Sequence, residues 1–534
     1  MVIKSASVTF DESVSFLADK HAHIKSIQTS NLFDDSMICK IKRQEELIDK
    51  SSKTLNTDLT IPMTYREAMT STESFEWSSA IQEEMNSMEE EVFIMKNLND
   101  DLKEVPREII LSTKWVFVWK PERFKARLVA QGFRQIHGIN HKETFVPTPT
   151  FSALKLLFSI TVTNNWPIKT FDVKVAFIHS IIDKPVYVWP PQGMNVPKYQ
   201  VLKLHKALYG TKQANRCWWI HLKEILQKVG FTANSEDPST YNFQKDGQNV
   251  ILWIHVDDGV LMALSTETLH WITAQLNAHL KIKWDTIIKG LVGISIEETA
   301  EGFKFSQPDL ITKLVDLNAS NITAKSPLPP NCKLESNLSL NDMDKPYLRR
   351  IGMLLYIAQA SRPDISYAVN YLAHFSMNTT QHHWDALENL TAYLRGTMYD
   401  GILIRKHQDI QQMTSWQSRR QTTVASSTAQ AKYMALSFAA RETLWIYNLF
   451  CKTIATKTPI LLSNNKTAVG ISTDSMSKKQ TRHLIREFNV INEYIVMKKL
   501  ELKWATTNEQ LADIMTKPLG NLKTQQFRQR MSLK

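Results

Sequence analysis

The hydrophobic positions of the chain follow a helical period in some segments and a strand-like period in others. From Trp77 to Val92, apolar side chains recur at spacings of four, four, three and four, which is one apolar stripe of an amphipathic helix. Ser74 is a suitable N-cap for this helix. Further helical patterns lie at residues 152–163, 218–229 and 347–394.

Two adjacent segments predict a short β-hairpin with one basic face. Residues 114–120 form an apolar, aromatic-rich run, and residues 123–130 alternate between basic and apolar side chains. Because successive side chains of a strand point to opposite sides, this alternation gathers the basic residues on one face.

Two neighbouring carboxylates lie where two strongly apolar strands, residues 250–256 and 259–263, turn into each other. Asp257 and Asp258 repel each other and resist burial unless a cation neutralises them. Oxygen ligands favour Mg²⁺ or Mn²⁺, although an isolated Asp-Asp pair is more often a plain exposed turn.

A third carboxylate, Asp172, lies within another buried strand, residues 170–177, which ends in an aromatic residue. If these strands are neighbours, three acids converge, and two ions about 3.5–4 Å apart there can support an in-line phosphoryl displacement.

The composition is that of a folded chain with several domains. At about 150 residues per domain, 534 residues predict three to four domains, and 43% hydrophobic content excludes a mainly disordered chain. The four cysteines lie far apart without a CxxC pair, which excludes a disulfide framework and a cysteine zinc site and fits a reducing compartment. Apolar runs stay below about 18 residues and the start lacks a signal-peptide core, so we expect a soluble intracellular protein.

Positive charge is concentrated at the C-terminal end. Residues 401–534 contain 21 lysine and arginine residues against 8 acidic ones, whereas the whole chain has a net charge of +11. The first 400 residues are therefore close to neutral. Two explanations stay open: contact with a polyanion, most simply nucleic acid, or ordinary solvated basic faces.

Seven short motifs follow one another between about residues 65 and 397. They are KWVF at 114–117, KARLVAQGF at 125–133, ETF at 143–145, DVKVAF at 172–177, LYGTKQA at 208–214, HVDD at 255–258 and RPDIS at 362–366. The ordered set resembles the reverse transcriptase of copia-type long-terminal-repeat retrotransposons. The resemblance implies an α+β right-hand polymerase with fingers, an antiparallel-sheet palm and a helical thumb/connection. It also implies RNA-directed DNA synthesis from deoxynucleoside triphosphates on an RNA or DNA template-primer.

The resemblance assigns the acidic residues to a metal site. Asp172 and Asp257 match the principal ligands of Mg²⁺ (or Mn²⁺), and Asp258 completes the acidic set. The family commonly has a tyrosine where this chain has His255. An imidazole can occupy that space, so the substitution does not exclude activity.

The same resemblance assigns four residues to nucleotide binding. Phe177 matches the aromatic beneath the incoming sugar, where its ring would clash with a 2′-hydroxyl; packing in the core is the alternative role. Lys125 and Arg127 match the fingers residues that grip the triphosphate, unless Lys125 is simply a solvated hairpin charge. Gln213 resembles the residue that lines the nucleotide pocket and positions the template base. The hairpin tip at residues 120–123 is shorter than in the family, which puts the geometry of the two cations in question.

A second set of motifs resembles the ribonuclease H domain that follows the polymerase in these elements. The motifs are SWQS at 415–418, VASSTAQAKYMAL at 424–436, NNKTA at 464–468, TRH at 481–483 and LADIMTKP at 511–518. The first strand, with its Asp, is missing before Thr414; Lys432 replaces a Glu, Asn464 replaces an Asp, and only Asp513 remains. Because a lysine repels cations and an amide lacks compensating charge, we expect no ribonuclease H activity. The remnant either binds a hybrid duplex through its basic surface or is only partly folded.

The expected organisation has four parts, with the proline-rich break at residues 327–330 close to one boundary. Residues 1–60 are a linker or disordered lead-in, 61–325 the fingers and palm, 326–400 the thumb/connection, and 401–534 the degenerate ribonuclease H-like domain.

The resemblance implies a cytoplasmic place within a virus-like particle, with nuclear access left open, and no membrane partner. An active polymerase is favoured over a catalytically inactive nucleic-acid-binding remnant, and a stand-alone metal nuclease is the weakest alternative.

Overall fold

The computed structural model describes most of the chain from residue 60 onward. The described residues are 60–88, 92–98, 106–120, 123–197, 199–288, 290–317, 321–335, 345–406, 413–421, 425, 427–450, 458–473 and 485–534. The expected lead-in at residues 1–60, except residue 60, and the motif at 481–483 lie outside them. None of the described helices combines the length and apolar character needed to cross a membrane.

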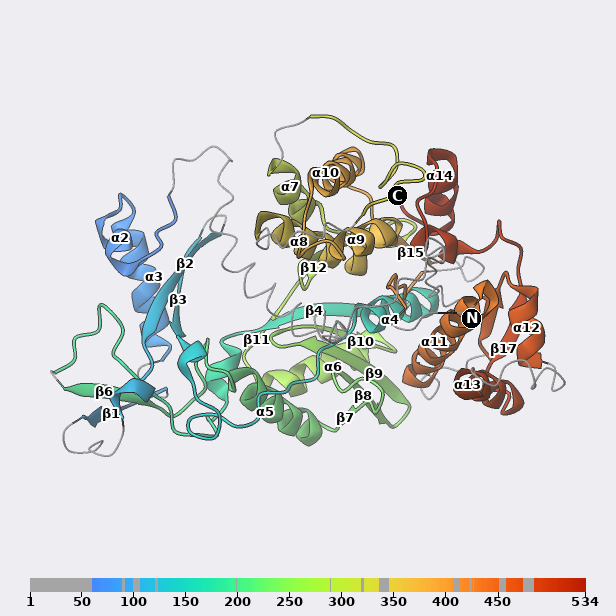
Figure 1. The fold of residues 1–534 in the computed structure, drawn as a ribbon. Coiled ribbons are helices and arrows are strands. Elements are labelled where there is room, and N and C mark those ends of the chain that lie inside the picture. The colour runs from blue at the N-terminus through green and yellow to red at the C-terminus, as the bar shows by residue number, and fades with distance from the viewer. Residues whose placement is uncertain are drawn as a thin grey trace.

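A six-stranded antiparallel sheet forms the middle of the molecule, with strands in the order β11-β4-β10-β9-β8-β7 (Figure 1). Their bounds are β4 Ile168–Val173, β7 Thr232–Ala233, β8 Thr240–Lys245, β9 Gln248–His255, β10 Asp258–Ala263 and β11 Ile282–Trp284. Helices α5 (Ala214–Val229) and α6 (Thr266–Asn277) cover one face, and α4 (Phe151–Asn164) packs on the other. Burial on both faces explains the near-continuous apolar runs of β9 and β10.

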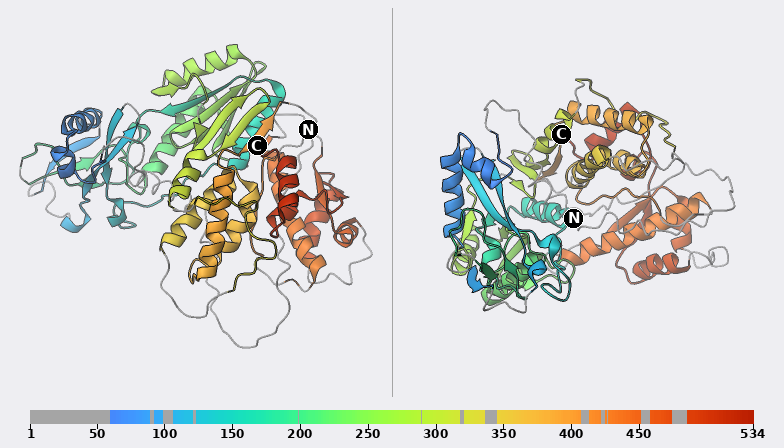
Figure 2. Two further views of the ribbon diagram at one scale, coloured as in Figure 1. Left: turned by 90° about the horizontal axis from the view of Figure 1, so that it is seen from above. Right: turned by 60° about the vertical axis from the view of Figure 1, so that its left-hand side comes forward.

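The predicted basic hairpin forms from β2 (Thr113–Lys120) and β3 (Arg123–Ala130). Helices α2 (Tyr65–Thr70) and α3 (Ser74–Asn86) share its core, in which the rings of Trp77 and Phe117 lie 5.2 Å apart. Beside them is a three-stranded sheet of β1 (Phe93–Asn97), β6 (Gln200–Leu204) and β5 (Tyr187–Val188). Figure 2 shows this group at one end of the central sheet and the C-terminal helices at the other. The helix predicted from Ser74 ends at Asn86, before the last residue of the stripe.

A helical module lies above the central sheet in Figure 1, and it includes a four-stranded sheet, in the order β12-β13-β14-β15, whose buried side chains pack against α4. Its elements are β12 Gly290–Leu291, β13 Ile294–Thr299, β14 Gly302–Ser306, α7 Pro308–Asp316, α8 Lys345–Ala360, α9 Ser366–Ala373, α10 Gln381–Gly396 and β15 Ile402–Arg405. The end of the chain pairs with β15: the backbones of Gly401 and Lys534 exchange hydrogen bonds of 2.9 and 3.1 Å. The C-terminal residues therefore extend this sheet by one more segment.

Helices α11, α12 and α13 pack around a two-stranded parallel sheet, whereas α14 packs against the core that contains α4. The elements are α11 Thr428–Phe450, β16 Ile460–Ser463, α12 Lys466–Thr473, α13 Ile485–Val496, β17 Glu501–Trp504 and α14 Asn521–Arg530. The architecture as a whole confirms the predicted α+β class with an antiparallel central sheet.

One sheet crosses two of the expected domain divisions, and one expected strand is shorter than predicted. The sheet of the helical module begins at β12 and ends with β15 and the last residues of the chain, so it crosses the expected divisions at residues 325/326 and 400/401. Such pairings join distant segments and leave no local pattern.

The strand expected to run from residue 170 to 177 ends at Val173, and Phe177 lies in a 3₁₀ helix, η4 (Ala176–His179). Val175 has φ of +52°, a left-handed conformation that a strand cannot include.

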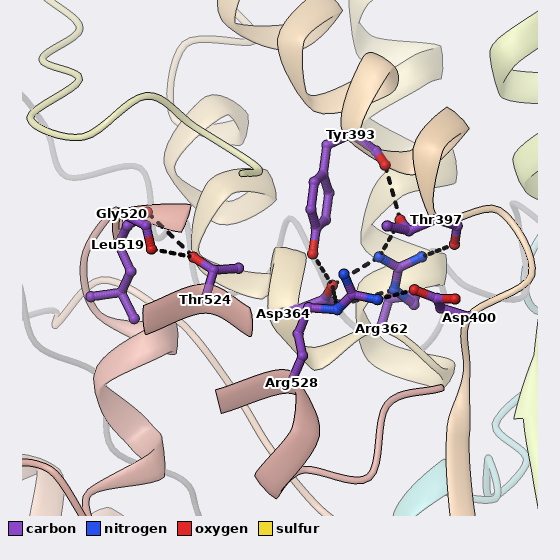
Figure 3. Close-up of polar contacts among 9 residues, drawn as sticks. All are labelled: Arg362, Asp364, Tyr393, Thr397, Asp400, Leu519, Gly520, Thr524 and Arg528. Carbon is purple, nitrogen blue, oxygen red and sulfur yellow. Dashed lines mark hydrogen bonds and ion pairs between the residues drawn. The ribbon is translucent and has the colours of Figure 1, made fainter. Parts of the chain in front are cut away.

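A buried ion pair occupies the centre of the helical module (Figure 3). The fully buried guanidinium of Arg362 donates to both carboxylate oxygens of Asp364 over 2.9 and 2.8 Å, and to the carbonyl and hydroxyl of Thr397 over 2.8 Å each. The hydroxyl of Tyr393 donates to the same carboxylate over 2.7 Å. Burial alone would raise the pKa of Asp364, but the pair with Arg362 outweighs it and lowers that pKa.

The same carboxylate ties the C-terminal helix to the module. Arg528 of α14 lies 3.7 Å from Asp364 and forms an ion pair with Asp400. Two guanidinium groups and two carboxylates thus balance each other in this cluster. The RPDIS motif, which begins at Arg362, therefore serves to hold the module and α14 together.

We expect Asp364→Ala to lower the free energy of unfolding by about 3–5 kcal/mol, because it leaves a buried guanidinium uncompensated. Glu83→Ala is a matched control, because it removes an ion pair with Arg123 in which both side chains are more than half exposed; its loss should be below about 1 kcal/mol. Urea unfolding followed by circular dichroism compares the two variants. Equal losses would contradict the assigned role of Asp364.

Candidate active site

The strands that carry Asp172 and Asp258 are neighbours in the central sheet. The antiparallel register of β4 and β10 places these two residues directly opposite each other. The backbone N–H of Val173 donates to the carbonyl of Asp257 over 2.9 Å. Asp172 and Asp258 are therefore the next pair of the ladder, of the non-hydrogen-bonded kind whose side chains approach most closely.

Asp172, Asp257 and Asp258 each place one carboxylate oxygen within 4.8 Å of the others. Within the described part of the chain, no other group of three His, Cys, Asp or Glu side chains meets in this way. Two unit charges about 4 Å apart repel each other by on the order of 1–4 kcal/mol, depending on the surrounding dielectric. Three ionised carboxylates at this spacing favour a bound cation, and an all-oxygen set suits Mg²⁺ or Mn²⁺.

The turn that carries Asp257 has an unfavourable backbone conformation. Val256 has φ of +60°, which is rare for a β-branched residue. The indole N–H of Trp218, on α5, donates to the carbonyl of Val256 over 2.6 Å and so holds the turn against the helix. At the other end of β9, Asp246 and Gly247 also have positive φ, but Asp-Gly is the sequence that such a hairpin turn prefers. Of the two turns that flank β9, only the turn with Val256 and Asp257 therefore has a strained backbone.

The two predicted phosphate-binding cations lie on one face of β3. Lys125 and Arg127 are alternate residues of the strand, and the Arg127 guanidinium lies over the ring of Tyr209, 5.5 Å from its centre. Glu84 of α3 reaches the same strand, where its carboxylate accepts the backbone N–H of Leu128 over 3.3 Å. Burial raises the pKa of Glu84, and that hydrogen bond and the charges of Lys125 and Arg127 partly oppose the rise. The cations therefore have an anionic neighbour within the protein.

The other two predicted nucleotide-binding residues have different surroundings. Phe177 is largely buried and packs edge-on against Tyr209, with ring centres 4.7 Å apart. Gln213 has a fully buried side chain at the start of α5, and its role in the nucleotide pocket stays a prediction. It accepts a hydrogen bond from Gln135 and donates one to the carbonyl of Asn140, each over 2.9 Å. This amide holds the loop before α4 in place.

Sequence reasoning missed three residues that shape this region. Tyr209 belongs to the LYGTKQA motif, but nothing in the motif indicates which of its residues is accessible. Glu84 resembles any solvated acid on a helix, and Trp218 resembles any core residue of α5. The partner that matters for each lies far away in the chain, so no local signal points to it.

Two positions at which the sequence lacks an expected carboxylate face each other in the C-terminal module. The ammonium of Lys432, on α11, donates to the side-chain carbonyl of Asn464, which follows β16, over 3.3 Å. The remaining acid, Asp513, forms an ion pair with Lys517 over 3.0 Å. The space between Lys432 and Asn464 thus holds a fixed positive charge, which repels a metal ion.

Residues 413–421, just after the expected position of the missing strand, belong to none of the described strands. Trp416 instead anchors this segment: its indole N–H donates to the carbonyl of Ala358 over 2.7 Å, and its ring lies 3.3 Å from the ammonium of Lys155. Lys155 is fully buried and donates to two carbonyls at the end of α8, and burial lowers its pKa well below the ordinary value. The segment therefore joins α4 to α8.

Comparison with known proteins gives three consistent likenesses. Residues 91–329 match the family described as reverse transcriptase (RNA-dependent DNA polymerase). The chain is 28% identical over 461 residues to the retrovirus-related Pol polyprotein from transposon RE1 of Arabidopsis thaliana, covering 78% of this chain and 31% of that protein. It is 27% identical over 506 residues to the corresponding polyprotein from transposon TNT 1-94 of Nicotiana tabacum, covering 85% and 38%.

The chain spans about a third of the length of these curated relatives. Among solved structures, a foamy viral protease-reverse transcriptase in complex with double-stranded DNA aligns with a TM-score of 0.40 and 11% identity. The alignment covers 89% of this chain and 80% of that chain.

We expect Mn²⁺ to raise the melting temperature of the protein, because a ligand that binds only the folded state adds about 2.7 kcal/mol at a hundredfold excess over its Kd. Asp257→Asn should remove most of this shift. Without metal, the same variant should melt at a higher temperature than the wild type, since it relieves repulsion between carboxylates.

Asp246→Asn is the matched control, because it changes an acid in the other turn of β9, where Asn also suits the positive φ. It should leave the Mn²⁺ shift unchanged. If Asp257→Asn keeps the full shift, the cation binds elsewhere. Differential scanning fluorimetry with titrated MnCl₂ gives both quantities.

Proposed function

Because residues 91–329 belong to the reverse transcriptase family and the chain is related to the Pol polyproteins of copia-type retrotransposons, we propose that it is an RNA-directed DNA polymerase. The reaction joins the α-phosphate of a deoxynucleoside triphosphate to a primer 3′-hydroxyl and releases pyrophosphate. The observation that carries the proposal is the meeting of Asp172, Asp257 and Asp258 at one rim of the central sheet.

The carboxylates of Asp172, Asp257 and Asp258 would hold two Mg²⁺ or Mn²⁺ ions. When bound, such ions supply Lewis acidity and charge neutralisation for in-line phosphoryl transfer. The pairing of β4 with β10 fixes two of the three carboxylates, and the hydrogen bond from Trp218 to Val256 fixes the turn that carries the third. Because the strands are rigid, the ligands need little reorganisation when substrate arrives.

The basic hairpin would bind the triphosphate. Lys125 and Arg127 lie on one face of β3, and charge-assisted hydrogen bonds from such side chains to phosphate are strong. Phe177 would form the wall that excludes a 2′-hydroxyl, a selection by steric exclusion.

The template-primer would extend toward the basic C-terminal part, whose lysines and arginines suit contacts with backbone phosphates. The proposed setting is a cytoplasmic virus-like particle.

We also propose that the C-terminal module lacks ribonuclease H activity. The Lys432–Asn464 contact supports this, because an ammonium replaces a ligand at the place where metal ions would have to bind. Asp513 alone, paired with Lys517, cannot hold two ions.

Primer extension tests the polymerase proposal directly. With oligo(dT) on poly(rA), dTTP and Mg²⁺ or Mn²⁺, the full chain should extend the primer. Asp257→Asn should lower the rate at least about a hundredfold, in line with the loss of one group that stabilises transition-state charge. Asp246→Asn should extend at the wild-type rate. Failure of the folded wild-type protein to extend with either metal would reject the proposal.

A labelled RNA/DNA hybrid tests the second proposal. The RNA strand should stay intact with the wild-type protein in Mg²⁺ or Mn²⁺. The double substitution Lys432→Glu with Asn464→Asp should not restore cleavage, because the first-strand carboxylate is still absent. Cleavage by the wild-type chain at a rate proportional to its concentration would overturn this proposal.

A further inference from the structure

The LYGTKQA segment, residues 208–214, is in direct backbone contact with the end of the basic hairpin. The N–H of Ala130, the last residue of β3, donates to the carbonyl of Tyr209 over 2.8 Å. Gly210 has φ of +88°, and a Cβ there would lie 2.1 Å from the carbonyl oxygen of Ala130. A Cβ on Gly132 would likewise lie 2.1 Å from the carbonyl oxygen of Gly210. Only glycine permits this approach at both positions, so the backbone of Tyr209 is fixed relative to β3.

The side chain of Tyr209 connects the hairpin to the central part of the molecule. Its ring meets the ring of Phe177 at an interplanar angle of 78°, with centres 4.7 Å apart, which is the favoured edge-to-face geometry. The guanidinium of Arg127 lies over the same ring, 5.5 Å from its centre. Tyr209 is half-buried, in contrast to the fully buried Gln213 four residues later.

The two contacts of Tyr209 join the residues proposed for two parts of the nucleotide, Phe177 for the sugar and Arg127 for the triphosphate. The guanidinium of Arg127 carries five N–H donors, more than a contact with one aromatic ring can occupy. Tyr209 can therefore set the position of Arg127 without occupying the donors that phosphate oxygens need. An edge-to-face partner also limits rotation of the Phe177 ring, and a wall must stay in place to exclude a hydroxyl group.

We infer that Tyr209 is a positioning residue for the incoming nucleotide, through Phe177 for the sugar and through Arg127 for the triphosphate. The inference rests on the proposed polymerase function and adds that one side chain couples sugar selection to triphosphate affinity.

Steady-state primer extension with dTTP and UTP measures both effects. Tyr209→Ala should raise KM for dTTP about tenfold, the range expected for a lost cation–π contact, with a smaller change in kcat. It should also lower the ratio of kcat/KM for dTTP to that for UTP by a similar factor. Tyr209→Phe, which keeps the ring, should retain both values.

Two further variants separate positioning from packing. Tyr209→Leu keeps apolar volume without the ring, so it should fold like the wild type and still show the raised KM and the reduced ratio. Gln135→Ala should lower the melting temperature by removing buried hydrogen bonds, yet leave the dTTP/UTP ratio unchanged.

The possible outcomes are distinct. Wild-type extension with unchanged KM and ratio in Tyr209→Ala and Tyr209→Leu overturns the inference and leaves the polymerase proposal standing. A ratio that moves in Gln135→Ala but not in the Tyr209 variants overturns it as well. No extension by the wild-type chain rejects the polymerase function, and the inference falls with it.

Discussion

The structure depends on one antiparallel pairing, that of β4 with β10, which sets two carboxylates against each other at the rim of the central sheet. A closely spaced cross-strand Asp–Asp pair is unfavourable by itself, and the turn beside it adds a left-handed Val256 and a third carboxylate, Asp257. Hydrophobic burial on both faces of the sheet supplies the stability that tolerates this arrangement. Strain and repulsion that persist at one rim of a well-packed sheet are typical of a functional site.

Other parts of the molecule are arranged around this rim by close, non-local contacts. Gly132 and Gly210 bring the hairpin against the segment before α5, so that Arg127, Tyr209 and Phe177 form a continuous series of contacts from the basic hairpin to the core of the central sheet. On the other side, the buried cluster around Arg362 and the pairing of the last residues with β15 hold the helical module to the C-terminal helix. The C-terminal region therefore contributes to the fold, whether or not it ever had a second catalytic role.

Local patterns were sufficient for much of this architecture. The alternation in residues 123–130 predicts β3 with the bounds that it has, and two apolar runs around Asp257 and Asp258 correctly predict a hairpin with acids at its turn. Long-range features could not be predicted in this way. Residues far away in the sequence determine the pairing of β15 with β14 and with the chain end, and also the burial of Gln213. The left-handed Val175, which ends β4 early, is a conformation that a β-branched residue rarely adopts, so its residue type does not predict it.

The convergence of Asp172, Asp257 and Asp258 is the claim on which the functional account depends, and anomalous scattering tests it most directly. A crystal of the full chain soaked in MnCl₂, with data collected above the manganese absorption edge, should give an anomalous peak among these three carboxylates. Coordination distances of about 2.0–2.2 Å to their oxygens would be expected for an ion of this kind. A refined structure in which Asp172 lies away from the acidic turn, or in which Mn²⁺ binds only at other acidic residues, would contradict the account.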